Sequence, residues 1–376
     1  MHSMTEPITD AWHAELAAQP FEEVYRRLEE TVSQLEQGEL SLTDSERLYV
    51  QGMELAHRCQ QLLTETELRI TQVGEPDDGR STASAPASSA SDDCSVASRD
   101  NHVLRVGWFS TGRGEGSRGL LNFVCQAIAD RRLDATIDFV FSNREPGEAA
   151  GSDEFFRLVQ QYGIPLATLS STRYRREHGG GGMNRHRAGF DRKAMRLLEP
   201  YQPDVCVLAG YMLIFGAEMC RRYPLLNLHG ALPDGPTGTW QSVIWQLIES
   251  GATRTGAMIH LATEQVDRGP VLSHCSLPII GREFDADWEA VTDSGIKELQ
   301  AAEGEDNALF RRIREEGYRR EPHLLLATLR AVADRRLQVR PGEALDGDGE
   351  PLAYMYRQGL PLTDEIEARS LPKRRD

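Results

Sequence analysis

Residues 205–229 read VCVLAGYMLIFGAEMCRRYPLLNLH and hold two short apolar runs, Val205–Leu208 and Leu225–Leu228. Apolar runs of this length, bounded by turn-forming residues, are typical of buried strands. Similar runs lie on both sides of this stretch, at Val103–Phe109, Ile137–Phe141, Met258–Leu261 and Val271–Ile279. We therefore expect these runs to form the strands of a sheet.

Stretches with helical spacing separate the strand-like runs, at Gly119–Asp130, Glu154–Gln161, Arg192–Leu198 and Gln241–Glu249. Strands that alternate with crossover helices indicate an open, mostly parallel α/β sheet of the Rossmann-like type. In such sheets, ligands bind at the carboxyl ends of the strands. The residues that follow each strand are therefore the place to look for chemistry.

The composition is that of an ordinary water-soluble protein, with 40% hydrophobic and 27% charged residues. A chain of 376 residues exceeds one typical core, so two domains are expected. No membrane span and no secretory signal is recognisable, and we expect a cytoplasmic location. The net charge of −16 argues against a polyanion-binding surface, so no direct nucleic-acid binding is expected. The six cysteines are scattered without a CxxC pair, which favours buried thiols over a metal site.

Residues 75–101, EPDDGRSTASAPASSASDDCSVASRDN, contain almost no large apolar side chains. Such a segment cannot bury enough surface to offset its ordering entropy, so we expect a flexible, disordered linker. It separates a first module, residues 1–74, from the α/β domain, residues 102–341. Residues 342–376 have weak periodicity, and we expect a loose C-terminal tail.

The first module has the pattern of an antiparallel two-helix hairpin. Apolar residues recur at helical spacing before Gly38, which ends the first helix, and Ser41–Asp44 offers a capping box for the second. The positions expected to be buried are Phe21, Val24, Tyr25, Leu28, Val32 and Leu35, then Leu48, Leu55, Cys59, Leu62 and Ile70. Two amphipathic helices share little surface, so a partner or self-association is expected.

Asn227 and His229 stand at i and i+2 at the end of an apolar strand, so both side chains point to one face. A lone histidine in such a place is usually a structural group bonded to backbone. Two polar side chains on the same face are harder to explain that way, because burying them without partners is unfavourable. We therefore treat the pair as candidate site residues.

Three other stretches have a structural and a functional interpretation. The turn that contains Gly116, Ser117 and Arg118 opens a helix, where it either satisfies chain geometry or binds an anion. The loop Thr263–Pro270, with Asp267 in it, is either an ordinary turn or part of a site. The run Leu208–Phe215 is either core or the wall of a pocket for a flat ring.

Together and in this order, these stretches resemble the 10-formyltetrahydrofolate-dependent formyltransferases, most closely the phosphoribosylglycinamide formyltransferase type, from about His102 to Leu337. The resemblance rests on VFSN (140–143), PDVCVLAGYM (203–212), LLNLHGALP (225–233) and TGAMIHLATEQVDRGPVL (255–272). It implies formyl transfer from 10-formyltetrahydrofolate, as a co-substrate without a metal, to the amine of a phosphorylated small molecule. The acceptor implied is glycinamide ribonucleotide, an intermediate of purine biosynthesis.

The resemblance also implies roles for residues of this chain. Asn227 and a protonated His229 would donate to the oxyanion, and Asp267 would stabilise the imidazolium and assist proton transfer. Gly116, Ser117 and Arg118 would bind the substrate phosphate, and Glu316, by a loose alignment, the substrate. The residues implied for folate binding are Tyr211, Met212, Leu213, Ile214, Phe215, Thr263 and Glu264.

The chain departs from the family pattern around the acceptor. The segment after His229 is one residue shorter than the usual His-Pro-Ser-Leu-Leu-Pro, and Arg118 and Leu213 replace the usual Asn and Arg. A Gly- and Arg-rich insertion, Arg173–Arg187, lies near substrate-facing positions of the family. The identity of the acceptor therefore stays open.

The hairpin resembles the small subunit of exodeoxyribonuclease VII through its RLEE start, its LEQGELSL turn, and LYVQGMELAHRC followed by ELRI. That family's small subunit binds the large nuclease subunit, which acts on single-stranded DNA. The resemblance implies a nuclease-subunit partner for residues 21–73. It leaves open the alternative that the chain works as an interaction partner in DNA degradation, with a divergent or inactive formyltransferase domain.

Overall fold

The computed structural model describes residues 103–264, 268–292, 295–352 and 358–369, with scattered residues between 12 and 58. The chain divides into two compact units. One comprises residues 1–99 with 179–185, and the other comprises residues 100–178 and 186–376. The expected linker, residues 75–101, lies outside the described residues.

In the first unit, residues of three helical stretches pack together, one before Pro20, one after it and one around Leu55. Trp12, Leu16, Val24 and Leu55 form one buried cluster, with Leu28 against it. A methyl group in place of the hydrogen at Gly52 would lie 3.5 Å from Thr31. These contacts agree with an antiparallel hairpin, while its turn, between residues 32 and 47, lies outside the described residues.

The second unit is built on one eight-stranded sheet with the order β10-β7-β6-β5-β4-β1-β2-β3. Its strands are β1 (Leu104–Phe109), β2 (Ala135–Ser142), β3 (Leu166–Thr168), β4 (Val205–Leu208), β5 (Leu225–His229), β6 (Arg254–Leu261), β7 (Val271–Pro278) and β10 (Leu360–Pro361). The β5–β6 and β6–β7 pairs are antiparallel, and the other pairs are parallel. The expected open, mostly parallel α/β sheet is confirmed.

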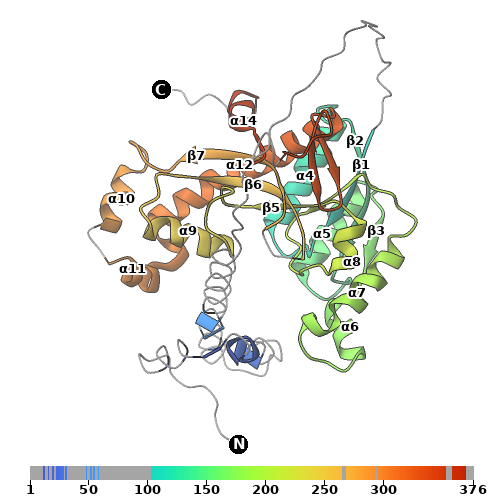
Figure 1. Ribbon diagram of the computed structural model, residues 1–376, viewed down its shortest axis with the longest axis horizontal. Coiled ribbons are helices and arrows are strands. Elements are labelled where there is room, and N and C mark those ends of the chain that lie inside the picture. Colours follow the sequence, from blue (N-terminus) through green and yellow to red (C-terminus); the bar gives the residue numbers. More distant parts are fainter. Residues whose placement is uncertain are drawn as a thin grey trace, which may run out of the picture. The chain divides into compact units, whose positions relative to one another are not determined.

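Helices lie on both sides of this sheet (Figure 1). They are α4 (Glu115–Ala129), α5 (Ala150–Gln161), α6 (Ser171–Glu177), α7 (Met183–Leu197), α8 (Ala217–Arg222), α9 (Trp240–Glu249), α10 (Asp285–Thr292), α11 (Ile296–Glu303), the 3-10 turn η1 (Gly304–Asp306), α12 (Ala308–Ala333) and α14 (Thr363–Arg369). None of the helices in the described part of the chain is long and apolar enough to cross a membrane.

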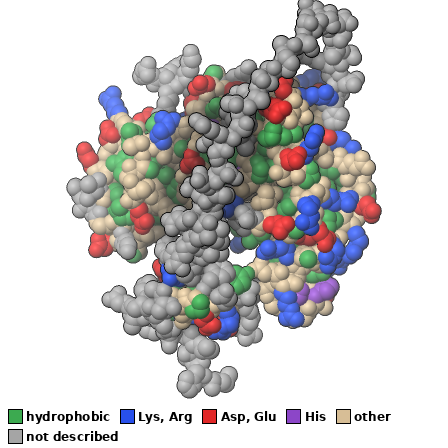
Figure 2. Space-filling view, in the orientation of Figure 1, with side chains coloured by type: hydrophobic (Ala, Val, Ile, Leu, Met, Phe, Trp, Pro, Cys, Tyr) green, Lys and Arg blue, Asp and Glu red, His purple; other side chains and the backbone are tan. Residues whose placement is uncertain are grey.

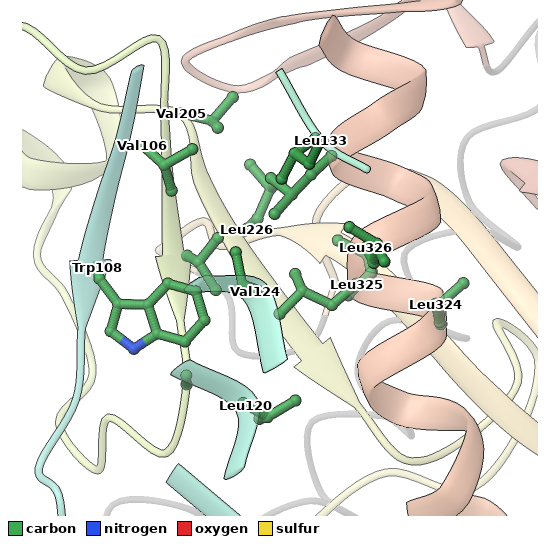
Figure 3. Close-up of a cluster of buried hydrophobic side chains, with 14 of the residues drawn as sticks. Val106, Trp108, Leu120, Val124, Leu133, Val205, Leu226, Leu324, Leu325 and Leu326 are labelled. Atoms are coloured by element: carbon green, nitrogen blue, oxygen red, sulfur yellow. The ribbon is translucent and has the colours of Figure 1, made fainter. Parts of the chain in front are cut away.

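Alternation along β1 divides the core between the two faces of the sheet. Trp108 faces a cluster that includes Val124 of α4 and Leu325 of α12 (Figure 3). Its neighbour Phe109 packs edge-on against Phe139 and Phe215 on the opposite face. Both residues are fully buried because β1 lies inside the sheet, between β4 and β2.

The 26-residue helix α12 packs on β6 and β7 and contacts α4, α9 and α14. Its first half contributes Leu309, Phe310 and Ile313 to a second buried cluster with α9. Its second half contributes Leu324–Leu326 to the main core. One helix therefore joins the two clusters, and it brings one of its faces to the carboxyl end of β5.

The expectation of a loose C-terminal tail is wrong for the residues that the structure describes there. Residues 343–346 form β9, which pairs with β8 (Leu337–Arg340). Further on, β10 extends the sheet beside β7, and α14 buries Ile366, 1% exposed, against the core. The apolar residues of this C-terminal segment are isolated in the sequence, and they become buried only through contacts with distant parts of the fold. Local periodicity therefore did not predict this structure.

Candidate active site

The site lies where the order of strands in the sheet reverses. Strands β2 and β3 lie on one side of β1, and β4 and β5 lie on the other, so the loops that follow β1 and β4 diverge from each other. The two loops are joined by a hydrogen bond from Thr111 N to Gly210 O, 3.1 Å long. A crevice at such a switch point is the usual ligand site of an open α/β sheet.

The predicted anion-binding turn opens helix α4 beside this crevice. Gly114 caps the helix in extended conformation, and Gly116–Arg118 form the first turn. Ser117 lies so close to Gly210 that any side chain at Gly210, whose φ is +69°, would collide with the serine hydroxyl. The first turn of α4 and the loop after β4 therefore form one wall.

The side chain of Arg118 points away from this wall. Its guanidinium pairs with Glu154 of α5 at 3.0 Å. Both residues line a surface groove of about 380 Å³ between α4 and α5, together with Asn122 and Arg157. Of the three residues predicted to bind phosphate, Gly116 and Ser117 stay with the site, and Arg118 is engaged elsewhere.

The loop after β4 divides the predicted folate-binding run into inward and outward residues. Tyr211 stacks on Phe215, with ring centroids 4.8 Å apart, and Phe109 lies edge-on to both rings. Burial raises the pKa of the Tyr211 hydroxyl well above its ordinary value. Met212 and Ile214 are 65% and 44% exposed. The two aromatic residues thus pack inward and hold the loop, and the side chains of Met212 and Ile214 are exposed at the surface.

Asn227 and His229 lie at the end of β5, as predicted. The Asn227 Nδ2 atom lies 3.0 Å from Nε2 of His260, its register partner on β6. The other ring nitrogen of His260 lies 3.0 Å from the carbonyl oxygen of Leu261. Because a carbonyl only accepts, Nδ1 of His260 carries the proton and Nε2 accepts from the amide of Asn227.

His229 is buried, with 7% of its surface exposed, and its Nε2 lies 3.3 Å from the carbonyl oxygen of Pro236 in the loop before α9. Its ring centre is 6.4 Å from that of His260. Three polar side chains therefore meet at the β5–β6 pair. His260 was missed in the sequence, where its only signal was its place inside an apolar strand.

Asp267, the third predicted catalytic residue, lies outside the described residues. The ends of its loop are described. Leu261 N donates to Pro270 O at 2.9 Å, which closes the loop at its base. Glu264, which precedes the gap, pairs with Arg221 of α8 at 3.6 Å. Helix α8, which follows the first predicted folate-binding segment (residues 211–215), therefore contacts the second segment (Thr263 and Glu264).

Helix α12 adds a group of residues that sequence analysis missed. Arg314, Tyr318 and Glu321 share one face of the helix through spacings of four and three residues. Glu321 lies next to Gly230, the residue after His229, and both line a pocket with Trp240. Glu316, the residue expected from the loose alignment, instead pairs with Arg320 at 2.7 Å and Arg319 at 3.0 Å. The structure thus brings Glu321, and not Glu316, to the site.

The Gly- and Arg-rich insertion forms the end of α6 and the start of α7 around glycines 179–182. Arg173 pairs with Glu145, and Tyr174 stacks on His178 with centroids 3.9 Å apart. Lysine and arginine side chains are frequent on the part of the surface formed by these helices (Figure 2). None of the contacts described for the insertion reaches Asn227 or His229.

Comparison with known proteins agrees with both parts of the chain. Residues 114–297 match the family model for formyl transferase, and residues 21–72 match that for the exonuclease VII small subunit. Over 179 residues the chain is 28% identical to the phosphoribosylglycinamide formyltransferase of Escherichia coli strain K12, which covers 47% of this chain and 75% of that protein.

Two further relatives are matched over smaller shares of their own length. Identity to the formyltetrahydrofolate deformylase of the same strain is 30% over 142 residues, or 37% of this chain and 43% of the relative. The chain spans 15% of the human trifunctional purine biosynthetic protein adenosine-3, at 26% identity. Among solved structures, the phosphoribosylglycinamide formyltransferase of Coxiella burnetii aligns with a TM-score of 0.49 and 21% identity, covering 69% of this chain and 99% of that one. Residues 114–297 are thus similar to the formyl transferase family, and residues 21–72 are similar to the exonuclease VII small subunit family.

Proposed function

We propose that the second unit transfers the formyl group of 10-formyltetrahydrofolate to the amine of a phosphorylated small molecule, with glycinamide ribonucleotide as the acceptor. The transfer forms a bond between the acceptor nitrogen and the formyl carbon and breaks the bond from that carbon to the folate nitrogen. One proton passes from the attacking amine to the leaving nitrogen. The relatives named for phosphoribosylglycinamide formyltransferase support this choice of acceptor.

The observation that carries the proposal is the pair Asn227–His260. The 3.0 Å hydrogen bond fixes the plane of the Asn227 amide at the strand end, beside buried His229. Negative charge develops on the formyl oxygen as the amine attacks. A donor that is already oriented stabilises that charge without reorganising during the reaction. We assign this role to the Asn227 amide.

His229 and Asp267 complete the proposed chemistry. The imidazole of His229, when protonated, donates to the same oxyanion, and the carboxylate of Asp267 stabilises the positive ring. Asp267 also assists the transfer of the amine proton to the leaving nitrogen. Proposed binding groups for the folate are Met212, Leu213 and Ile214 with Thr263 and Glu264, while Tyr211 and Phe215 hold the loop in place.

The test is the release of tetrahydrofolate from 10-formyltetrahydrofolate by the full chain, with and without glycinamide ribonucleotide. We expect release that depends on the amine, and a loss of about 100- to 1,000-fold in His229→Ala and Asp267→Asn. Activity that both substitutions leave unchanged would contradict the assigned mechanism.

A second candidate reaction uses water in place of the amine, because formyltetrahydrofolate deformylases are also among the relatives. Formate released at the same rate with and without any amine would identify this reaction. Formylated amine as the main product would exclude it. The same assay therefore separates the two reactions.

For the first unit we propose binding to a large nuclease subunit through residues 21–73, on the basis of the match to the exonuclease VII small subunit. Pull-down of a purified exodeoxyribonuclease VII large subunit by the full chain tests this. The matched variant is Val24→Asp, because Val24 is fully buried in the helical cluster and a charge there disrupts it. Equal capture by both proteins would contradict binding through the hairpin.

A further inference from the structure

The loop after β4, residues 211–216, is held at both of its ends by side chains from other parts of the fold. Near its start, Met212 N donates to the hydroxyl oxygen of Thr111, 3.1 Å away. At its end, Gly216 N donates to Oδ2 of Asp191, 2.6 Å away. Between these two points the loop exposes apolar side chains at the surface. Two side chains from different elements therefore set the position of the exposed stretch.

Thr111 is itself fixed, at the switch point between β1 and β4. It is 1% exposed, and its hydroxyl donates to Oδ1 of Asn143 at 2.7 Å. Its carbonyl oxygen accepts from the hydroxyl of Ser152 on α5 at 2.9 Å. The hydroxyl proton is therefore directed to Asn143, and the hydroxyl oxygen accepts from Met212 N. A buried hydroxyl whose donor and acceptor are both used holds one orientation.

The two helices on either side of the glycine-rich segment 179–182 support these contacts. Ser171, the first residue of α6, accepts at its hydroxyl from Nδ2 of Asn143 at 3.3 Å. Ser171 N also donates to the carbonyl oxygen of Asn143 at 3.0 Å. Asp191 belongs to α7 and is 3% exposed. The loop after β4 is thus tied to α6 through a chain of side chains and to α7 through one carboxylate.

We propose that Thr111 and Asp191 are positioning residues for the proposed folate-binding loop, and that helices α6 and α7 support it. The Gly- and Arg-rich insertion lies between Ser171 and Asp191 in the sequence, so its role is to support the loop and not to contact the reacting groups. This inference rests on the proposed function, because the folate is assigned to this loop there. A loop that already has its bound conformation loses less freedom when the ligand binds, so these contacts strengthen binding.

The test measures formyl transfer by the full chain in variants that remove or keep each contact. Thr111→Val preserves the shape of the side chain and removes the hydroxyl, and Thr111→Ser keeps the hydroxyl. We expect KM for 10-formyltetrahydrofolate to rise about tenfold in Thr111→Val, the effect of one lost hydrogen bond, and to stay within about twofold in Thr111→Ser. The value of kcat at saturating folate is expected to stay within about threefold in both variants.

Asp191 is tested in the same way. Asp191→Ala removes the acceptor for Gly216 N and is expected to raise the same KM about tenfold, whereas Asp191→Asn keeps an acceptor and is expected to restore it. The matched control is Thr328→Val, because Thr328 is also fully buried and its hydroxyl lies 2.6 Å from that of Ser273, in the core between α12 and β7. It is expected to lower the melting temperature without changing KM. The control therefore separates the loss of a buried hydrogen bond from the loss of loop position.

Amide hydrogen exchange tests the two contacts without turnover or ligand. We expect faster exchange in residues 211–216 of Thr111→Val and Asp191→Ala than in wild type and Thr328→Val, because the two loop amides lose their acceptors. Equal exchange in all four proteins overturns the inference, and so does an unchanged KM in both variants that remove a contact. A wild-type chain that does not bind 10-formyltetrahydrofolate, while the variants show the expected exchange, supports the positioning contacts and counts against the proposed function.

Discussion

Asn227 and His260 face each other across the antiparallel pair β5–β6, with Nδ2 of the asparagine 3.0 Å from Nε2 of the histidine. His260 is almost fully buried, and its Nδ1 is tied to the backbone at Leu261. These two contacts fix the tautomer and the ring orientation of His260. The ring in turn orients the amide of Asn227, which we assign as a donor to the oxyanion.

This geometry predicts that His260 positions Asn227. His260→Ala is expected to lower kcat about tenfold, the effect of one lost hydrogen bond, without changing KM for the folate. His260→Gln, which keeps an acceptor for the Asn227 amide, is expected to recover most of the rate. A merely structural role for His260 would lower the melting temperature of both variants and show no such recovery in kcat.

Removal of the proposed oxyanion donor should have a larger effect. Asn227→Ala is expected to lower kcat for tetrahydrofolate release by about 100- to 1,000-fold. Asn227→Asp is expected to be as poor, because a carboxylate places negative charge beside the developing oxyanion. The control is Asn122→Ala on helix α4, outside the β5–β6 pair. A rate near that of wild type in Asn227→Asp would rule out the donor role.

Burial of an acidic side chain predicts a pH-dependent stability. Asp191 on α7 is 3% exposed, and its Oδ2 accepts a 2.6 Å hydrogen bond from Gly216 N. Burial raises the pKa of this carboxyl to about 6, while the hydrogen bond from Gly216 and the charge of Arg187 oppose the rise. Because the folded-state pKa is raised, the contribution of Asp191 is most favourable below its ordinary pKa and is lost as pH rises through about 6.

Asp191→Asn keeps the acceptor for Gly216 and removes the charge. Relative to wild type, it is expected to gain about 2 kcal/mol of unfolding free energy between pH 4 and pH 7. Urea unfolding at both pH values measures the difference. A difference between the two proteins that does not change with pH would show that Asp191 does not titrate in this range.

The C-terminal segment is predicted to contribute to stability. Ile366→Ala on α14 is expected to lower the unfolding free energy by about 2 to 5 kcal/mol, because it leaves a cavity in the core. The matched substitution is Ile280→Ala, since Ile280 is 50% exposed. It is expected to cost well under 1 kcal/mol. Equal effects in thermal or urea unfolding would mean that α14 does not pack as described.

Six of the eight strands of the sheet were predictable because their signal is local, whereas the short strands β3 and β10 were not expected. Apolar runs such as Val205–Leu208 form strands without information from distant residues, and the observed bounds of β4 are the same. Helix α12 gave no comparable signal. Gly317 and Pro322, two residues that disfavour helix, lie inside its sequence, and its charged first half contains few apolar residues. Its burial between β6, β7 and α9 outweighs these unfavourable local preferences.

The sequence by itself determined the class of fold, the strand-end position of Asn227 and His229, and the family that the domain resembles. Only the tertiary structure decided which side chains meet there. It paired His260 with Asn227, turned Arg118 toward Glu154, and brought Glu321 rather than Glu316 to Gly230. The reason is that the direction of a side chain depends on its neighbours across strands and helices. Those neighbours are set by β-sheet register and by helix packing, and neither is a property of any short stretch of sequence.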